Sequence, residues 1–487
     1  MIVRDFAAAT ARRFDVIVVG GGIYGAAVLY EATRRGLSAC LCEAQDFGSG
    51  TSWNSLRILH GGLRYLQTGE LGRFHESVAA RREFAILFQD LVQPMRFMMP
   101  LYRQGLRRGS VLRAALIAND LLSARRNHGV IDALHIGRGG LLDAGSVRGA
   151  CPVVREPGLQ GAACWTDYVM LSSERILMEL LRNAALDGAI ALNYARVVDV
   201  KSASGQFRGV CVRDECTGSL HELAASTIVN CTGAEVAALA ERLGGAPPKL
   251  FEPSLAFNVL LEHELPGGAA LAVSGPSAGS QLLFLVPMGR VTMAGTCHVP
   301  RPGGTVVAEA TEPEIAAFLR SLNDAVPQWG VRREHVMRVL AGLLPVRTPG
   351  TTRLLRGEAI VDHGRSGGLR GAYSVAGVKF TTALRAARRI ASKLAPQPAV
   401  SSRESDSIRV AAQTPWLIDH TRLWSADPNA TARALATVMR EEAAHDMADL
   451  ILRRTNWSTA TRAEFVRARV SELLRPRSEA LSEPGVR

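Results

Sequence analysis

Short apolar runs and segments with helical periodicity alternate along the chain, and the pattern is clearest at its start. Val16–Val19 is apolar and β-branched, as a strand buried in a parallel sheet requires. Glycines follow, and then the helical pattern of Ala26–Arg35. A second apolar run, LSACLC, ends at Glu43. Strand, glycine turn, helix and strand in this order predict a βαβ unit and an α/β fold.

Strand patterns dominate the middle of the chain, and helical patterns dominate its end. Residues 195–226 alternate apolar and polar positions between glycine turns, which predicts a β-meander. Residues 281–300 predict a hairpin, and a short strand at Ala372–Val375 precedes an amphipathic helix. Ser173–Asp187 has helical periodicity, as does most of the chain after the polar stretch 401–407, which is predicted to be a linker.

Composition is that of an ordinary soluble globular protein. The chain has 487 residues, of which 47% are hydrophobic and 21% charged. No run of about 18 apolar residues predicts a membrane span, because glycines interrupt the longest candidate, Val16–Tyr30. The N-terminus lacks the pattern of a secretory signal. We therefore expect a cytoplasmic protein that is at most peripheral on the inner face of the cell membrane.

The net charge is +12, and arginine supplies most of it, because only Lys201, Lys249, Lys379 and Lys393 are lysines among 57 basic residues. This charge attracts anions such as a phosphorylated substrate or an anionic membrane, although most of it is expected to be solvated surface. No compact basic block is present, so nucleic acid is not an expected partner. Eight cysteines without a CxxC spacing predict buried, reduced thiols, and no metal site is predicted.

The glycines after the first strand have the spacing Gly20-x-Gly22-x-x-Gly25. The first glycine permits a tight turn, the second lets the backbone approach a pyrophosphate, and the third allows helix and strand to pack closely. Glu43, about 20 residues further on, has the position of the acid that bonds a ribose hydroxyl, which argues against NADP. With its flanking strands and helix, the spacing predicts a dinucleotide site. It resembles that of FAD-dependent enzymes built on the amino-acid-oxidase-like plan.

Two later strands also end on glycine. One closes on Thr232-Gly233, and the other meets Gly377 and a helix that Thr381 opens. Free N–H groups at a helix N-terminus can stabilise negative charge on the pyrimidine edge of a reduced flavin. Lys379 stands at the mouth of this helix; the alternative is an ordinary surface lysine.

The segment Asn54–Glu70, NSLRILHGGLRYLQTGE, concentrates groups that carry protons or positive charge. An alcohol that gives up a hydride must also lose its hydroxyl proton, and His60 is a candidate base. Arg64 presents a planar fork suited to phosphate oxygens, and Tyr65 can hydrogen-bond a substrate oxygen. The alternative for His60 is a structural histidine packed under the cofactor.

These segments resemble the respiratory-type, FAD-dependent glycerol-3-phosphate dehydrogenase family. The most specific block is HGGLRYL, and further blocks in matching order are QPMRFMMPLY, LPVR, SVAGVKFTTALRAARRIA and LILRRTNW. The resemblance implies non-covalent FAD and hydride transfer to flavin N5 from a secondary alcohol. That alcohol would be glycerol 3-phosphate, giving dihydroxyacetone phosphate, or a related polyol phosphate. Quinone or oxygen would accept the electrons, and peripheral membrane contact and a homodimer are compatible with the family.

The implied fold is α/β, with an FAD-binding Rossmann-like domain, an interleaved antiparallel-sheet substrate domain and a small C-terminal helical domain. The predicted boundaries are 12–95, 145–248 and 340–397 for the FAD-binding domain, 96–144 and 249–339 for the substrate domain, and 408–487 for the helical domain.

Motifs and resemblance together define the predicted site. The predicted catalytic residues are His60, Arg64, Tyr65 and Lys379. The predicted cofactor contacts are Gly20, Gly21, Gly22, Gly25, Glu43, Thr51, Ser52, Val197, Thr232, Gly233, Gly377, Phe380 and Thr381. The predicted substrate contacts are Arg64, Tyr65, Thr296, His298, Arg347 and Lys379.

Three substrate-side blocks depart from the family pattern. Leu344 stands where the family has the arginine of a G-x-R-P block that holds the substrate phosphate, although Arg347 follows closely. The family's GTTD is GTCH here and ends in His298, and Asp167–Leu177 differs from the usual DAR block. The alternatives are therefore an oxidase or dehydrogenase of an unphosphorylated hydroxy or amino compound, and a flavin-binding protein without turnover.

Overall fold

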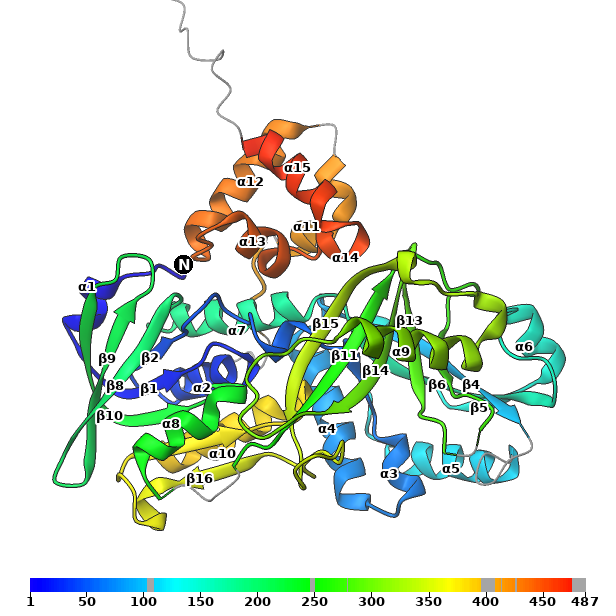
Figure 1. The fold of residues 1–487 in the computed structure, drawn as a ribbon, viewed down its shortest axis with the longest axis horizontal. Coiled ribbons are helices and arrows are strands. Elements are labelled where there is room, and N and C mark those ends of the chain that lie inside the picture. Colours follow the sequence, from blue (N-terminus) through cyan, green and yellow to red (C-terminus); the bar gives the residue numbers. More distant parts are fainter. Residues whose placement is uncertain are drawn as a thin grey trace, which may run out of the picture.

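The computed structural model describes residues 1–102, 109–245, 250–277, 279–395, 408–412, 414–424 and 427–474. These residues form two β-sheets with helices packed on them, and a group of C-terminal helices above both (Figure 1). The predicted α/β class with a helical C-terminal region is confirmed. The predicted linker 401–407 and Lys249 lie outside the described residues.

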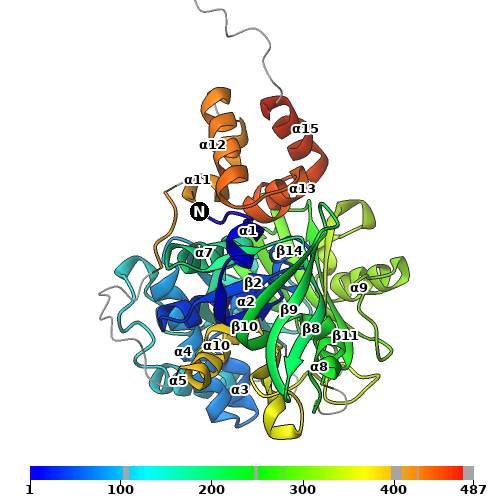
Figure 2. The ribbon, with the colours of Figure 1, turned by 90° about the vertical axis from the view of Figure 1, so that its left-hand side faces the viewer.

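The first sheet is mostly parallel and contains the predicted βαβ unit. Its strands are, in order, β16 (Ala359–Asp362), β17 (Ala372–Ala376), β10 (Leu220–Asn230), β1 (Arg13–Val19), β2 (Ala39–Cys42) and β7 (Ile190–Leu192), with β8 (Ala195–Ala203) and β9 (Gln206–Asp214) beside β10. The apolar end of β1 is buried because helices cover the sheet. The hairpin β8–β9 runs antiparallel into β10, which confirms the predicted meander (Figure 2).

The helices of this half pack against one another as well as on the sheet. They are α1 (Phe6–Thr10), α2 (Ile23–Arg34), α7 (Ser173–Leu186), α8 (Val236–Leu243) and α10 (Ala383–Leu394). α2 contacts both α7 and α10, so the helix that follows the glycine turn lies at the centre of this layer.

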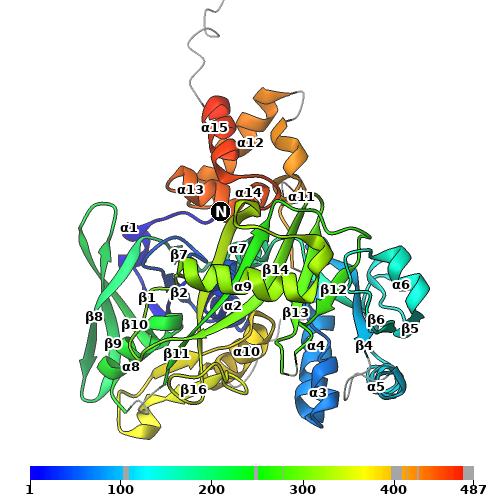
Figure 3. The ribbon, with the colours of Figure 1, turned by 45° about the vertical axis from the view of Figure 1, so that its right-hand side comes forward.

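The second sheet is mixed and draws its strands from distant parts of the chain. They are, in order, β15 (Val336–Pro345), β11 (Pro253–Leu261), β14 (Val291–Pro300), β13 (Leu283–Met288), β12 (Ala270–Val273), β4 (Val92–Tyr102), β6 (Leu159–Met170) and β3 (Ile58–Leu59), with β5 (Gly140–Asp143) beside β6. The predicted hairpin is β13–β14. α9 (Glu312–Ala325) covers one face of this sheet (Figure 3). The ring of Phe318 on α9 packs against that of Phe257 on β11.

The sheets divide the chain differently from the predicted boundaries. β6 lies in the segment 145–248 that was predicted to bind FAD, yet it pairs with β4 along its whole length in the second sheet. β3 and the end of β15 likewise come from predicted FAD-binding segments. Each sheet therefore draws strands from distant segments, because strand pairing depends on which edges meet in space and not on proximity in the sequence.

The remaining helices lie at the two ends of the molecule. α3 (Leu63–Gln67), α4 (Leu71–Leu87), α5 (Gly109–Leu122) and α6 (Ala144–Ala150) accompany the second sheet, and α11 (Thr414–Ile418), α12 (Pro428–Glu441), α13 (Met447–Asp449), α14 (Trp457–Ala460) and α15 (Ala463–Leu474) form the C-terminal group. The C-terminal helices enclose an apolar core of their own around Leu435 and Trp457. No helix among the described residues combines the length and apolarity that crossing a bilayer requires.

Buried ion pairs join the C-terminal helices to the first sheet. Arg454 binds Asp46 with an Nη2–Oδ1 distance of 2.7 Å, and Arg175 of α7 binds Glu442 with an Nη1–Oε2 distance of 2.6 Å. All four side chains are fully buried. Asp46 lies between β2 and the segment that contains Ser49, Thr51 and Ser52. The ion pair of Asp46 with Arg454 therefore fixes the start of this segment to the C-terminal helices.

Candidate active site

A cavity of about 1000 Å³ lies between the carboxyl ends of the first sheet's parallel strands and the second sheet. Residues that follow β1, β2, β10 and β17 line one side of it, and residues of β11, β14 and β15 line the other. Ligands of open α/β sheets bind beyond the carboxyl ends of the strands. The volume is at the upper end of the range for small-molecule and cofactor sites.

The three glycines of the first turn are required for different reasons. Gly20 has a φ of 102°, and a Cβ there would lie 2.5 Å from the Cys231 carbonyl oxygen. A Cβ on Gly25 would lie 1.8 Å from the Gly20 carbonyl oxygen, so α2 could not approach β1. A Cβ on Gly22 would meet only the Ser52 hydroxyl, at 3.1 Å. Gly22 therefore keeps cavity space open, whereas the other two permit the turn and its packing.

Glu43 ties the glycine turn to the end of β2. Its carboxylate accepts hydrogen bonds from Gly21 N–H at 2.6 Å and from Gln45 N–H at 2.8 Å. Burial raises the pKa of Glu43, and these two N–H donors oppose the rise. The side chain lines the cavity at the position expected of a ribose-binding acid.

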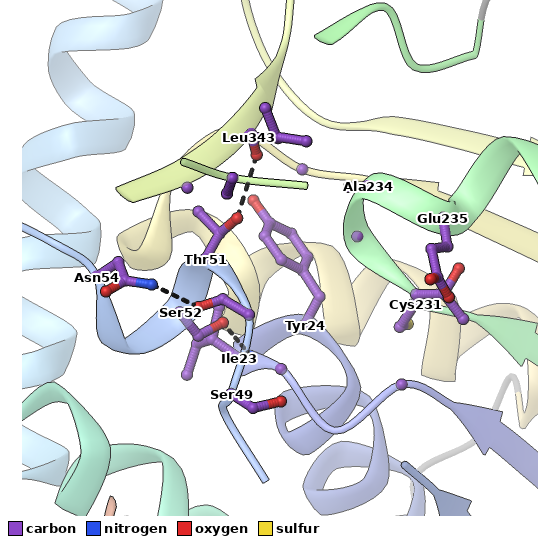
Figure 4. Close-up of a pocket in the computed structure, with 18 of the residues that line it drawn as sticks. Ile23, Tyr24, Ser49, Thr51, Ser52, Asn54, Cys231, Ala234, Glu235 and Leu343 are labelled. Atoms are coloured by element: carbon purple, nitrogen blue, oxygen red, sulfur yellow. Dashed lines mark hydrogen bonds between the residues drawn. The ribbon is translucent and has the colours of Figure 1, made fainter. Parts of the chain in front are cut away.

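The hydroxyl residues after β2 connect the two sheets. Ser52 Oγ accepts from Ile23 N–H at 2.9 Å, and Thr51 Oγ1 donates to the Leu343 carbonyl at 3.2 Å (Figure 4). Both residues belong to a short 3-10 helix, Thr51–Trp53, that lines the cavity. Ser52 thus bonds the start of α2, directly after the glycine turn, and Thr51 bonds β15.

Tyr24 links the glycine turn to the loop after β17, and the sequence analysis missed it. Its hydroxyl donates to the Lys379 carbonyl at 2.9 Å and lies 3.0 Å from Thr382 Oγ1. Burial raises the pKa of Tyr24 to about 12, so the hydroxyl stays protonated. Tyr24 occupies a variable position of the glycine motif, where the spacing carries no signal.

Cationic groups surround Tyr65 beside the cavity. Lys379 Nζ donates to the Tyr65 hydroxyl at 2.5 Å and lies 4.6 Å from its ring centroid. The Arg73 guanidinium covers the same ring at 4.3 Å and donates to the hydroxyl at 3.2 Å. Arg64 precedes Tyr65 on α3 and is exposed, with no carboxylate paired to it among the described residues.

His298 lies on the cavity side of the second sheet, close to Arg64. It pairs with cavity-lining Ala256, two residues beyond cavity-lining Thr296, and such neighbours share a face. Burial lowers the pKa of His298, and the charge of Arg64 lowers it further. Its Nδ1 is buried and has no hydrogen-bond partner among the described residues. His298 is thus a neutral donor or acceptor that is free to bind a ligand.

The structure brings most predicted residues together. The cavity wall contains Gly20, Gly22, Glu43, Thr51, Ser52, Val197, Thr232, Gly233, Thr296, Gly377, Lys379 and Phe380, and also Leu344. His60, Arg64, Tyr65, His298 and Thr381 lie outside this wall, and Gly21 and Gly25 support it from behind. Arg347, which was predicted to contact the substrate, is exposed in the turn after β15 and does not line the cavity.

A buried acid beside His60 was also missed. Asp167 Oδ2 lies 3.8 Å from His60 Nδ1, and the Arg81 guanidinium binds the same carboxylate. The sequence drew attention to Asp167 only as the start of a departing block. Among the described residues, no cluster of three or more His, Cys, Asp or Glu side chains could hold a metal ion.

The glycine turn, Glu43 and the 3-10 helix Thr51–Trp53 line one large cavity between two sheets. This arrangement is typical of proteins that bind a dinucleotide cofactor. A family model described as FAD dependent oxidoreductase matches residues 15–393. The chain therefore belongs to the FAD dependent oxidoreductase family.

Named relatives agree with this assignment. The chain is 30% identical over 385 residues to the probable mitochondrial glycerol-3-phosphate dehydrogenase of Caenorhabditis elegans, and 27% identical over 393 residues to the glycerol-3-phosphate dehydrogenase of Synechocystis. The matches cover 76% and 78% of this chain but 51% and 69% of those proteins, so the chain spans only part of their length. The FAD complex of a Bacillus halodurans glycerol-3-phosphate dehydrogenase shares the fold, with a TM-score of 0.72 and 18% identity, over 96% of this chain and 90% of that one.

The described residues fit FAD. The cavity is large enough for a dinucleotide, and the open side of Gly22 leaves backbone N–H groups accessible at the start of α2. The glycine turn and Glu43 would hold the pyrophosphate and ribose. The helix Thr51–Trp53 and the loop around Gly377 would hold the remainder.

Proposed function

We propose that the protein oxidises the secondary hydroxyl of glycerol 3-phosphate, or of a related polyol phosphate, to a ketone. The observation that supports this most strongly is the group of Arg64, Lys379 and His298 beside the cavity. It offers an anionic substrate two cations and an imidazole whose Nδ1 has no hydrogen-bond partner among the described residues. The glycerol-3-phosphate dehydrogenases among its relatives also support the proposal.

Each side chain has a distinct role in this proposal. Arg64 and Lys379 bind and orient the phosphate-bearing alcohol, and Tyr65, which Lys379 and Arg73 hold in place, hydrogen-bonds a substrate oxygen. His60 takes the hydroxyl proton. When bound, FAD supplies the hydride acceptor. Quinone or oxygen then takes the electrons.

One observation favours a different substrate class. Leu344 lines the cavity where the family has a phosphate-binding arginine, and the exposed Arg347 does not replace it. An unphosphorylated hydroxy or amino compound is therefore the second candidate.

Anaerobic mixing of the FAD-loaded protein with a panel of compounds tests the proposal. We expect sn-glycerol 3-phosphate to bleach the flavin absorption near 450 nm faster than glycerol, hydroxy acids or amino acids do. Bleaching by an unphosphorylated compound alone would favour the second candidate, and bleaching by no compound would contradict both.

Replacing Arg64 by alanine should raise the KM for a phosphorylated substrate. A hydrogen bond to a charged group contributes roughly 1.5–3 kcal/mol, which corresponds to about 10- to 100-fold in KM. Arg347→Ala is the matched control and should leave KM unchanged, because Arg347 lies outside the cavity.

Leu344→Arg separates the two substrate classes. It should retain or improve use of the phosphorylated substrate, whereas an apolar substrate pocket would be disrupted by the unpaired charge.

We further propose peripheral membrane contact through α5, at the end of the molecule opposite the C-terminal helices (Figure 1). Ile117, Leu121 and Leu122 expose 55%, 73% and 41% of their surface there, and Arg113 and Arg125 are exposed nearby. Exposed apolar side chains with basic neighbours suit an anionic lipid surface. α5 also contacts α3, which carries Arg64 and Tyr65, so the site would face the membrane.

Leu121→Glu should reduce co-sedimentation of the protein with phosphatidylglycerol vesicles at least several-fold. The matched control is Leu220→Glu, which adds the same charge at a 65% exposed leucine of β10. Equal losses in both variants would indicate a general charge effect and contradict a contact through α5.

A further inference from the structure

Asp167 is a buried carboxylate that receives several hydrogen bonds at the edge of the proposed site. It lies on β6 with its side chain 4% exposed. Oδ1 accepts from Gly61 N–H at 2.8 Å and from the Arg81 guanidinium, and Oδ2 accepts from Trp165 Nε1–H at 3.0 Å. Oδ2 also faces His60 Nδ1 at 3.8 Å. These three donors fix the position of the carboxylate, and its Oδ2 faces the imidazole of His60.

The surroundings keep Asp167 ionised. Burial would raise the pKa of Asp167, but the charge of Arg81 and the neighbouring His60 outweigh it, and the pKa is lowered. Gly61 makes this arrangement possible, because a Cβ there would lie 2.2 Å from Arg81 Nη1 and 3.0 Å from Asp167 Oδ1. Gly61 is therefore required for a buried Asp–Arg pair to lie beneath the histidine.

His60 is exposed on its other side. Its side chain is 46% exposed, and its ring packs against Phe284 of β13 at a centroid distance of 5.0 Å. The charged side chains nearest to it are Asp167 on β6, Arg81 on α4 and Arg64 on α3. Asp120 lies near Gly61 but is paired with Arg126, so among the described residues Asp167 is the carboxylate that faces the His60 imidazole.

We propose that Asp167 is the positioning residue of His60, an inference that rests on the proposed alcohol oxidation. The carboxylate holds the proton of His60 on Nδ1, which leaves Nε2 unprotonated and directed away from the protein. Nε2 is then the atom that accepts the proton of the substrate hydroxyl, and bound FAD would supply the hydride acceptor that the oxidation of this alcohol to a carbonyl requires. Asp167 then stabilises the imidazolium without taking its proton, because Arg81 favours the ionised form of the carboxylate.

A double-mutant cycle on the FAD-loaded protein distinguishes positioning from a structural role. With saturating substrate under anaerobic conditions, Asp167→Asn should slow flavin reduction about 100-fold, within the range that general base catalysis supplies. Substrate binding and FAD content should change little, whereas thermal stability should fall because the buried Arg81 loses its charged partner. In a His60→Gln background, Asp167→Asn should have no further effect on the rate, because both changes remove the same function.

Two controls keep the test decisive. Asp132→Asn removes the carboxylate of an exposed Asp–His pair, 3.5 Å from His135, and should leave the rate unchanged. If Asp167→Asn fails to fold because Arg81 is left unpaired, Arg81→Gln combined with Asp167→Asn replaces it in the cycle. A full additional loss in the His60→Gln background, or no loss in the single variant, would overturn the proposal. If glycerol 3-phosphate does not reduce the wild-type protein, the proposed function fails, and the cycle is run with the compound that does.

Discussion

Gly22→Val is expected to produce a folded protein without FAD. The backbone of Gly22 has a φ of −74° and a ψ of −177°, an extended conformation that valine adopts readily. Its Cβ would meet no backbone atom within 4 Å, only the Ser52 hydroxyl at 3.1 Å, so the side chain has room in the empty cavity. It would occupy the space that the pyrophosphate needs at the start of α2. Flavin content after purification measures the effect, and circular dichroism reports the fold.

Substitutions at two other glycines serve as controls for this result. Gly72→Ala on α4 should retain full FAD content, because nothing lies within 4 Å of the added carbon. Gly25→Ala should disturb the fold itself, since its Cβ would lie 1.8 Å from a backbone oxygen. Stoichiometric FAD in Gly22→Val would show that the dinucleotide does not bind at this turn.

Removing the carboxylate of Asp46 is expected to lower the free energy of unfolding by about 3–5 kcal/mol, the usual cost of breaking a buried ion pair from one side. Asp46 accepts from Arg454 at 2.7 and 2.8 Å, from Arg453 at 2.5 Å and from Asn193 at 2.8 Å. Asp46→Ala would leave the buried guanidinium of Arg454 without its two closest charged contacts and with the more distant Glu442 carboxylate, 3.9 Å from its Nε. Urea unfolding followed by tryptophan fluorescence measures the change.

The same pair predicts a pH dependence. Burial opposes ionisation of Asp46, but the charges and hydrogen bonds of Arg454 and Arg453 prevail and lower its pKa to about 2. Because the folded-state pKa lies below the ordinary value of 3.8, the stabilisation is complete above about pH 4 and is lost as the pH falls toward 2. Asp46→Ala should remove this part of the acid dependence of stability.

An exposed ion pair across the same junction provides the control. Arg462 binds Glu262 at 2.8 Å, with exposed fractions of 36% and 53%. Arg462→Ala should cost less than about 1 kcal/mol, because solvent screens exposed pairs. If Asp46→Ala and Arg462→Ala lowered the free energy of unfolding equally, burial of the ion pair would not explain the stability that the C-terminal helices contribute.

Local patterns were sufficient to predict the cofactor side of the site. Gly20, Gly22, Gly25 and Glu43 are spaced within one βαβ unit, and the geometry of that unit determines where a phosphate and a ribose can lie. The meander β8–β10, the hairpin β13–β14 and the C-terminal helices also follow from apolar periodicity, because each buries a face that its own residues define.

Only the tertiary structure decided what faces the cavity from distant parts of the chain. The pairing of β6 with β4 places Asp167 beneath His60, and the register of β11 with β14 places His298 opposite cavity-lining Ala256. The tertiary structure also shows that Arg347 is exposed, whereas Leu344 lines the cavity. No pattern within a short segment encodes these contacts, since long-range strand pairing depends on which edges the rest of the chain leaves available. The sequence thus determined a dinucleotide-binding α/β protein, and the pairing of remote strands determined which side chains lie around its cavity.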